Sequence, residues 1–237
     1  KQMTAQLLHQ EKMAALGLVT AGVAHEIGNP LSGVLAEAKR GRGVDDPQEL
    51  RSILSTVEDL AQRMSRLLRE LVDFGRRRRD LAALVSLNQV SEDVVRLLGH
   101  DPRSRGVTIE TQLTDPLPPV RAKEDQLVQV LLNLGLNALD SLQGAEERKL
   151  LIETEAQDGE VRVRVIDSGP GVPRSQRARI FEPFWTSKGA ERGTGLGLFL
   201  SRDVAESLGG RLELVSAEPG RCVFELSLPS EDEGEPS

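Results

Sequence analysis

Two long stretches of helical hydrophobic periodicity open the chain. Apolar or small residues recur three and four positions apart from Leu16 to Ala38, which places them on one face of a helix. Two glycines and Pro47 then predict a turn. A second stretch, from Leu50 to Phe74, has the near-heptad spacing of a bundle or coiled-coil helix. Residues 1–78 are therefore predicted to form a helical hairpin.

The apolar stripe of this hairpin has no third helix beside it to cover it. Two hairpins can bury both stripes by pairing into a four-helix bundle, so we predict a homodimer formed through the helical hairpin. The alternative is a single hairpin that packs against its own second domain.

The hydrophobic pattern changes after the arginine run at residues 76–79. Five stretches have the composition or alternation of strands, namely residues 107–113, 150–154, 160–166, 211–215 and 222–228. Three stretches have helical periods, namely residues 89–98, 124–142 and 196–208. A sheet with helices on one face is the natural packing, so residues 79–230 are predicted to form an α/β two-layer sandwich and the fold class is α + α/β. Residues 231–237, which are acidic with Gly and Pro, are predicted to form a disordered tail.

The charge balance excludes one class of partner. The chain has 30 Lys and Arg residues against 37 Asp and Glu residues, a formal net charge of −7. A general nucleic-acid binder usually carries a basic excess, so no nucleic-acid partner is predicted. We interpret the arginine run as a solvated helix end or linker.

Cys222 is the only cysteine, which excludes an internal disulfide and a metal site built from cysteines. It lies in an apolar, strand-like stretch, where a buried and inert thiol is expected. No apolar run reaches the roughly 18 residues that a membrane helix needs, and no signal peptide is recognisable. We expect a cytoplasmic chain without membrane contact, either soluble or the cytoplasmic part of an anchored protein. Because it opens inside a helical pattern, we also expect further sequence upstream.

His25 lies on the polar side of the first helix. At about 100° per residue it faces away from the apolar stripe, and Asn29, four positions on, shares its exposed face. Glu26 flanks both, and Pro30 is expected to kink the helix because it clashes with the carbonyl one turn back. A neutral imidazole can act as a nucleophile, with Glu26 fixing its tautomer and accepting a proton. The alternative is a solvated histidine that has no chemical role.

Two asparagines lie on the helix predicted at residues 124–142. Asn133 and Asn137 are four positions apart and so share one face of an otherwise apolar helix. Carboxamides in such surroundings need polar partners, and their oxygens suit Mg²⁺ alongside phosphate and water. The alternative is a hydrogen bond between helices.

Two glycine-containing motifs follow. Asp167 ends a predicted strand and begins the motif D-x-G-x-G, where a carboxylate can accept a hydrogen bond from the amine of adenine. Gly169 and Gly171 would let the backbone approach the base, although the motif alone is also typical of a turn. Residues 193–198 form a glycine-rich start of a helix, whose backbone N–H groups suit phosphate. This start matches neither a dinucleotide fingerprint nor a Walker loop.

The order of the motifs is specific. H-E-x-x-N-P at residues 25–30 precedes the two asparagines, and D-x-G-x-G, F-E-P-F and G-T-G-L-G-L follow at residues 167–171, 181–184 and 193–198. This series resembles the phospho-acceptor box and the N, G1, F and G2 boxes of bacterial sensor histidine kinases. The resemblance covers residues 12–228, the catalytic core with its dimerisation and phosphotransfer domain and its ATP-binding domain. The superfamily of the latter includes gyrase, a heat-shock chaperone and mismatch-repair ATPases.

The resemblance implies a role for each site residue. Asn137 coordinates Mg²⁺ with Asn133 nearby, and Asp167 binds adenine in a pocket that the two glycines after it shape. The residues that line the phosphates are Gly193, Thr194, Gly195, Leu196 and Gly197. Lys188 lies in the stretch that matches the ATP lid and is the best placed cation for the terminal phosphates. Asp140 departs from the family pattern, because many relatives carry a basic or amide residue there.

The resemblance also implies an activity. ATP, with Mg²⁺, phosphorylates His25 with the help of Glu26, and the phosphoryl group then passes to an aspartate in the receiver domain of a response regulator. In relatives with this box the residue at Asn29 orients a water that dephosphorylates the regulator, which implies phosphatase activity too. The alternatives are a nucleotide-binding scaffold without catalysis and another ATPase of the superfamily. The hairpin with its histidine argues against the latter.

Overall fold

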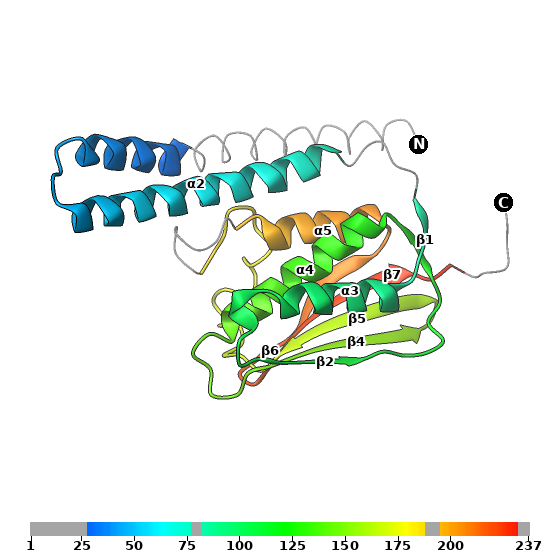
Figure 1. Ribbon diagram of the computed structural model, residues 1–237. Coiled ribbons are helices and arrows are strands. Elements are labelled where there is room, and N and C mark those ends of the chain that lie inside the picture. Colours follow the sequence, from blue (N-terminus) through cyan, green and yellow to red (C-terminus); the bar gives the residue numbers. More distant parts are fainter. Residues whose placement is uncertain (1–27, 77–81, 188–194, 232–237) are drawn as a thin grey trace. The chain divides into compact units, whose positions relative to one another are not determined.

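The computed structural model describes residues 28–76, 82–187 and 195–231. They fall into two compact units, a helical unit over residues 28–76 and a mixed unit over residues 82–185 and 195–231 (Figure 1). None of the helices within these ranges is long and apolar enough to cross a membrane.

The helical unit is the predicted hairpin. The described part of its first helix runs over residues 28–41, and α2 (Pro47–Arg76) follows a short turn. Asp46 caps α2, since its carboxylate accepts a hydrogen bond of 3.0 Å from the backbone N–H of Gln48. Pro47 suits the first helical position because its fixed φ and missing N–H cost nothing there. The helix therefore begins at Pro47, three residues before the apolar periodicity that starts at Leu50. The kink expected at Pro30 involves Glu26, which lies outside the described residues.

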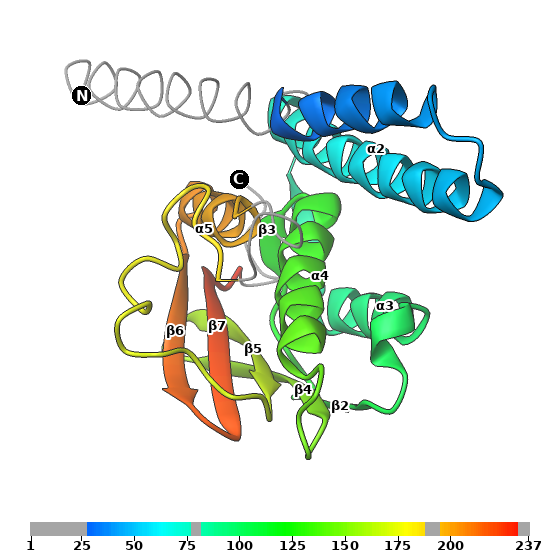
Figure 2. The same ribbon diagram turned by 90° about the vertical axis from the view of Figure 1, so that its left-hand side faces the viewer.

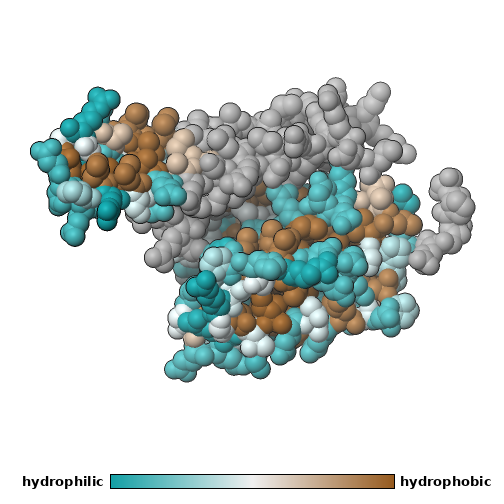
Figure 3. Space-filling model, viewed as in Figure 1, coloured by the Kyte–Doolittle hydropathy of each residue, from teal (hydrophilic) through white to brown (hydrophobic). Residues whose placement is uncertain are grey.

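Much of the apolar surface of the hairpin is not covered within the helical unit itself. Ile53 of α2 is buried, but leucines on both helices are exposed, namely Leu31, Leu35, Leu50 and Leu54. Figure 3 shows apolar atoms gathered on this part of the molecule. An uncovered apolar face of this kind is what a partner helix would bury.

The mixed unit is built on a five-stranded sheet with the strand order β2-β4-β5-β7-β6. The strands are β2 (Thr108–Gln112), β4 (Lys149–Gln157), β5 (Glu160–Asp167), β6 (Arg211–Glu218) and β7 (Arg221–Pro229). Only the pair β2–β4 is parallel. The helices α3 (Leu87–Gly99), α4 (Glu124–Ser141) and α5 (Gly197–Ser207) cover one face of the sheet (Figures 1 and 2). The predicted two-layer sandwich is confirmed.

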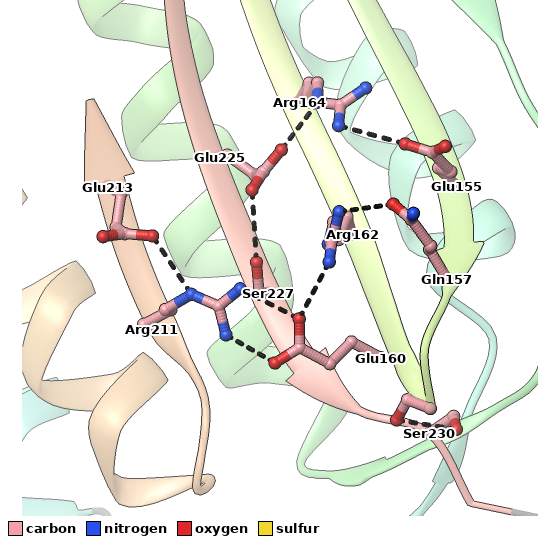
Figure 4. Close-up of polar contacts among 11 residues, drawn as sticks. Glu155, Gln157, Glu160, Arg162, Arg164, Arg211, Glu213, Glu225, Ser227 and Ser230 are labelled. Carbon is pink, nitrogen blue, oxygen red and sulfur yellow. Dashed lines mark hydrogen bonds and ion pairs between the residues drawn. The ribbon is translucent and has the colours of Figure 1, made fainter. Parts of the chain in front are cut away.

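The two faces of the sheet differ because side chains alternate along each strand. On β5, Val161, Val163 and Val165 are buried in the core beneath the helices. The alternate residues Arg162 and Arg164 lie on the other face, where Arg164 forms ion pairs with two neighbouring strands and Arg162 pairs with Glu160 of its own strand (Figure 4). That face is therefore covered by paired charged side chains instead of a second layer.

Some elements differ from the sequence expectation. The strands β1 (Ala83–Val85) and β3 (Val120–Ala122) form a small antiparallel sheet that was not predicted, because three residues are too few to reveal alternation. Strand β6 extends to Glu218, past its predicted end, across a break in register between Leu214 and Ser216 that disturbs the period of two. At the chain's end, Glu231 pairs with Arg121 at 3.2 Å. Residues 232–237 of the predicted tail lie outside the described residues.

Candidate functional site

Asp167 is the last residue of β5 and is 4% exposed. Its Oδ1 accepts two hydrogen bonds, one of 2.8 Å from the hydroxyl of Ser141 and one of 2.9 Å from the backbone N–H of Gly169. The cross-strand neighbour of Asp167 on β7 is Cys222. Strand β5, the end of α4 and the loop after β5 therefore meet at this carboxyl group.

Burial is the largest influence on the ionisation of this group. It raises the pKa of Asp167, while hydrogen bonds from Ser141, Gly169 and the thiol of Cys222 act in the opposite direction. Burial, together with the adjacent carboxylate, raises the pKa of Cys222 to about 12. The thiol is therefore protonated at neutral pH and is a weak hydrogen-bond donor, in line with the buried, inert thiol that the sequence predicts.

Gly169 and Gly171 are required by close contacts of the loop. A Cβ on Gly169 would lie 2.6 Å from Asp167 Oδ1 and 2.6 Å from Ser141 Oγ. Gly171 has a φ of +74°, and a Cβ there would lie 2.3 Å from the carbonyl oxygen of Ala217. The backbone N–H of Val172 donates to that same oxygen at 3.0 Å, which fastens the loop to β6. The motif thus holds the loop in place against Asp167, Ser141 and strand β6.

Asn133 joins two helices. Its amide nitrogen donates a hydrogen bond of 3.0 Å to the hydroxyl of Ser201, which is buried on α5. A Cβ on Gly197 would lie 2.3 Å from Asn133 Oδ1, so the start of α5 lies directly against this side chain. The alternative of a hydrogen bond between helices therefore holds for Asn133. Asn137, one turn later on α4, is partly exposed.

The start of α5 is shaped by its glycines. Gly195 has a φ of +67°, and a Cβ there would lie 2.3 Å from the carbonyl carbon of Phe184. Leu196 occupies the N-cap position and has no side-chain oxygen to accept from the first-turn N–H groups, so an anion is a suitable partner for them. Its side chain is buried, which leaves only its backbone to contact phosphates.

Five of the candidate residues lie outside the described part of the chain, namely His25, Glu26, Lys188, Gly193 and Thr194. Asn29 lies in the first helix and is exposed, as predicted. The described residues thus bring together Asp167, Gly169 and Gly171 in one cluster, and Asn133 and Gly197 in another.

Asp140, which departs from the family pattern, has a structural partner. Its Oδ1 accepts a hydrogen bond of 2.8 Å from Nη1 of Arg103, and the same guanidinium pairs with Asp101. The two carboxylates raise the pKa of Arg103, so its guanidinium stays ionised. This acidic residue therefore ties α4 to the turn at Pro102–Ser104 (η1).

Two features of the site were missed from the sequence. Ser141 contacts Asp167, yet in the sequence it is only a serine at the end of a helix; its position four residues after Asn137 was the available signal. Phe181, in F-E-P-F, lies edge-on to Phe224 of β7 with ring centroids 6.3 Å apart. The guanidinium of Arg202 on α5 lies 5.1 Å from the same ring. This aromatic residue thus anchors its segment between the sheet and α5.

Two family models match the chain. The "His Kinase A (phospho-acceptor) domain" matches residues 15–80, and the "Histidine kinase-, DNA gyrase B-, and HSP90-like ATPase" matches residues 122–232. The sensor histidine kinase ZraS of Escherichia coli strain K12 is 34% identical over 229 residues, which are 94% of this chain and 48% of ZraS. The chain spans about half the length of the curated relatives it matches.

Solved structures agree with these matches. The catalytic domain of the histidine kinase ThkA is 31% identical with a TM-score of 0.56, over 63% of this chain and 95% of that domain. A crystal structure of ThkA in complex with the response regulator protein TrrA is 28% identical with a TM-score of 0.74, over 95% of this chain and 65% of that one. The chain therefore belongs to the family of bacterial sensor histidine kinases, of which it represents the catalytic core.

Proposed function

We propose that this chain transfers the γ-phosphoryl group of ATP to His25 and then to an aspartate in the receiver domain of a response regulator. The observation that carries the proposal is the buried carboxyl of Asp167, held by Ser141 and Gly169 at the end of β5. A fixed acceptor of this kind suits the exocyclic amine of adenine. The family description of residues 122–232 as an ATPase supports the same ligand.

The phosphates belong at the start of α5. The first-turn N–H groups of this helix, around Gly195 and Gly197, suit an anion. The family motif adds Gly193 and Thr194 to this lining, and Lys188 as a cation for the terminal phosphates. A domain boundary near residue 79, with residues 1–78 for phosphotransfer and 79–230 for ATP binding, follows from the same assignment.

Mg²⁺ fits the amide side chain of Asn137. This partly exposed residue lies on α4, one turn after Asn133. Asn133 bonds Ser201 and abuts Gly197, so its main part is to hold the start of α5. Bound Mg²⁺ would neutralise charge on the phosphate oxygens.

The chemistry at His25 is a substitution at phosphorus. A neutral ring nitrogen attacks the γ-phosphorus while the bond to the bridging oxygen of ADP breaks. Glu26 accepts the proton from the second ring nitrogen, because a carboxylate can act as a base where the amide of Asn29 cannot. A carboxylate oxygen of the regulator's aspartate then attacks the phosphorus, and the bond from phosphorus to the ring nitrogen of His25 breaks. Asn29 would orient a water that hydrolyses the resulting acyl phosphate.

The exposed leucines of the hairpin support a homodimer in which two hairpins form a four-helix bundle. The complex of ThkA with TrrA supports a response regulator as the partner. Since ATP and receiver domains occur inside the cell, this part of the protein would lie in the cytoplasm.

The test is incubation with γ-labelled ATP and Mg²⁺, followed by analysis of the protein-bound label. The proposal predicts label that is lost in acid and kept in base, because a phosphoramidate is acid-labile. Nucleotide binding without label would identify a silent scaffold, and steady release of phosphate without label would identify an ATPase. Either result would overturn the proposed function.

A further inference from the structure

Ser141 is the last residue of α4 and lies directly beneath the loop that follows β5. Its hydroxyl oxygen is 2.8 Å from Asp167 Oδ1 and 2.8 Å from the carbonyl oxygen of Ala138. A Cβ on Gly169 would lie 3.2 Å from the Cβ of Ser141, so there is little space between loop and serine. The hydroxyl is thus confined to the immediate surroundings of the carboxyl group.

The hydroxyl has one hydrogen and two acceptors within reach. A bond to an ionised carboxylate is about twice as strong as one to a neutral carbonyl. The hydrogen therefore points to Asp167 whenever that residue is ionised. The bond to Ala138 is the ordinary helix-end alternative.

The two bonds to Asp167 fix its orientation. A carboxylate offers about four acceptor positions, two on each oxygen. The hydroxyl of Ser141 and the N–H of Gly169 both donate to Oδ1 and so occupy its two positions. These two donors leave the positions of Oδ2 to a ligand, and the thiol of Cys222 is a further, weak donor to the carboxyl group.

We propose that Ser141 is a positioning residue for base recognition. It holds the carboxyl of Asp167 so that Oδ2 accepts the 6-amino group of adenine, and it thereby adds to the preference for purines that carry this group. The inference rests on the proposed function, since it presupposes that Asp167 lies in the ATP site.

The chain supplies a matched control in Ser207. This residue ends α5 as Ser141 ends α4, and its hydroxyl donates to the carbonyl of Val204 at 2.7 Å. That bond uses its single hydrogen. Ser207→Ala therefore removes the same helix-end bond without removing a donor to Asp167.

The experiment compares two nucleotides by calorimetry in the whole chain, namely ATP and the triphosphate of purine riboside, which lacks the 6-amino group. Wild type should bind ATP roughly ten- to a hundredfold more tightly than the analogue, because only ATP can donate a hydrogen bond from its 6-amino group to the charged carboxylate of Asp167. Ser141→Ala should reduce this preference by about three- to tenfold through weaker ATP binding, with the affinity for the analogue nearly unchanged. Ser207→Ala should keep the wild-type preference.

The same substitution in a chain that already carries Asp167→Asn shows whether Ser141 acts through the carboxyl group of Asp167. In an Asp167→Asn chain, which already lacks the preference, Ser141→Ala should change neither affinity further. Equal losses for both nucleotides, or a preference that Ser141→Ala leaves intact, would refute the role of Ser141 while the ATP site stands. A wild type without any preference would instead overturn the site at Asp167, and the inference with it. Thermal melts of each variant establish that it is folded.

Discussion

Asp167 shows how a single buried carboxyl group can lower the stability of the fold that contains it. Its unfolded-state pKa is about 3.9, and burial raises the value in the folded state. Between these two pKa values the folded chain holds a proton that the unfolded chain has released. The stability that the fold gains from this bound proton is fully present below the unfolded-state pKa. It is lost as the pH rises through the folded-state pKa. Above the unfolded pKa, burial of this carboxyl group therefore costs the fold stability.

Asp167→Asn should remove this effect while abolishing base recognition. The amide oxygen can still accept from Ser141 and Gly169, but the NH₂ group in place of the other oxygen would face the adenine amine donor to donor. We expect a higher melting temperature at pH 7, a gain that shrinks as the pH approaches 4, and ATP binding weaker by roughly ten- to a hundredfold. Melting curves across this pH range and calorimetry measure both effects. A variant less stable than wild type at pH 7 would show that burial does not dominate this group.

Single residues also mark where sequence reasoning reaches its limit. Asp167 was singled out because its motif stands in a specific order with the other motifs of the family; D-x-G-x-G alone is also typical of a turn. The contact of Asp167 with Ser141 joins residues 26 positions apart, and the one local signal for Ser141 was its place on the same helix face as Asn137. For Asn133 the sequence left a Mg²⁺ ligand and a helix-to-helix hydrogen bond open, and the structure shows the hydrogen bond, which the amide nitrogen makes to Ser201 on a second helix. The amide oxygen as a Mg²⁺ ligand stays a prediction.

Among the larger elements, the loop after β5 and the turn between β6 and β7 are interlocked. The N–H of Gly220 donates to the carbonyl of Gly169 at 2.8 Å, and Val172 bonds Ala217 from the other side. The position of the loop after β5 therefore depends on a turn more than forty residues further along the chain. If ATP binds at this loop as proposed, changes in that turn should alter the affinity for ATP.

Gly171→Ala and Gly220→Ala form a matched pair that tests this interlock. Both glycines have positive φ, +74° and +79°, so either substitution costs about 1–2 kcal/mol in backbone strain. A Cβ on Gly171 would in addition meet backbone atoms at 2.3 Å, whereas one on Gly220 meets nothing within 4 Å in the described chain. Urea unfolding should show a clearly larger loss for Gly171→Ala, together with weaker ATP binding. Equal losses in the two variants would contradict the close packing of the loop.

The sequence predicts the elements unevenly. All five strands of the large sheet and its three helices were identified, because buried faces impose periods of two and 3.6 on runs of five residues or more. The register break at β6 escaped because it interrupts the period of two, and the three-residue strands β1 and β3 escaped because they are too short to show a period and pair with each other from distant positions. Side-chain periodicity thus predicts layers well and strand ends poorly.

For the molecule as a whole, the exposed leucines of the hairpin lead to a prediction about assembly. Leu54 of α2 is 58% exposed, and Leu97 of α3, in the mixed unit, is 50% exposed. If two hairpins form a bundle, Leu54→Glu buries a charge at their interface and should shift the chain to monomers at micromolar concentration. Leu97→Glu, equally exposed in the free chain, should leave the dimer intact. Light scattering after size-exclusion chromatography gives both masses, and a dimer that survives Leu54→Glu would place the interface elsewhere.

The phosphorylation site is tested most directly by replacing each of the three histidines in turn. His9, His25 and His100 are changed singly to Gln, and each variant is incubated with γ-labelled ATP and Mg²⁺. If His25 is the phosphorylated residue, only His25→Gln should lose the acid-labile, base-stable label, and its ATP affinity should stay near that of wild type. His9→Gln and His100→Gln should be labelled like the parent chain. Acid-labile label that persists on the folded His25→Gln variant would contradict the assignment of His25 as the phosphorylation site.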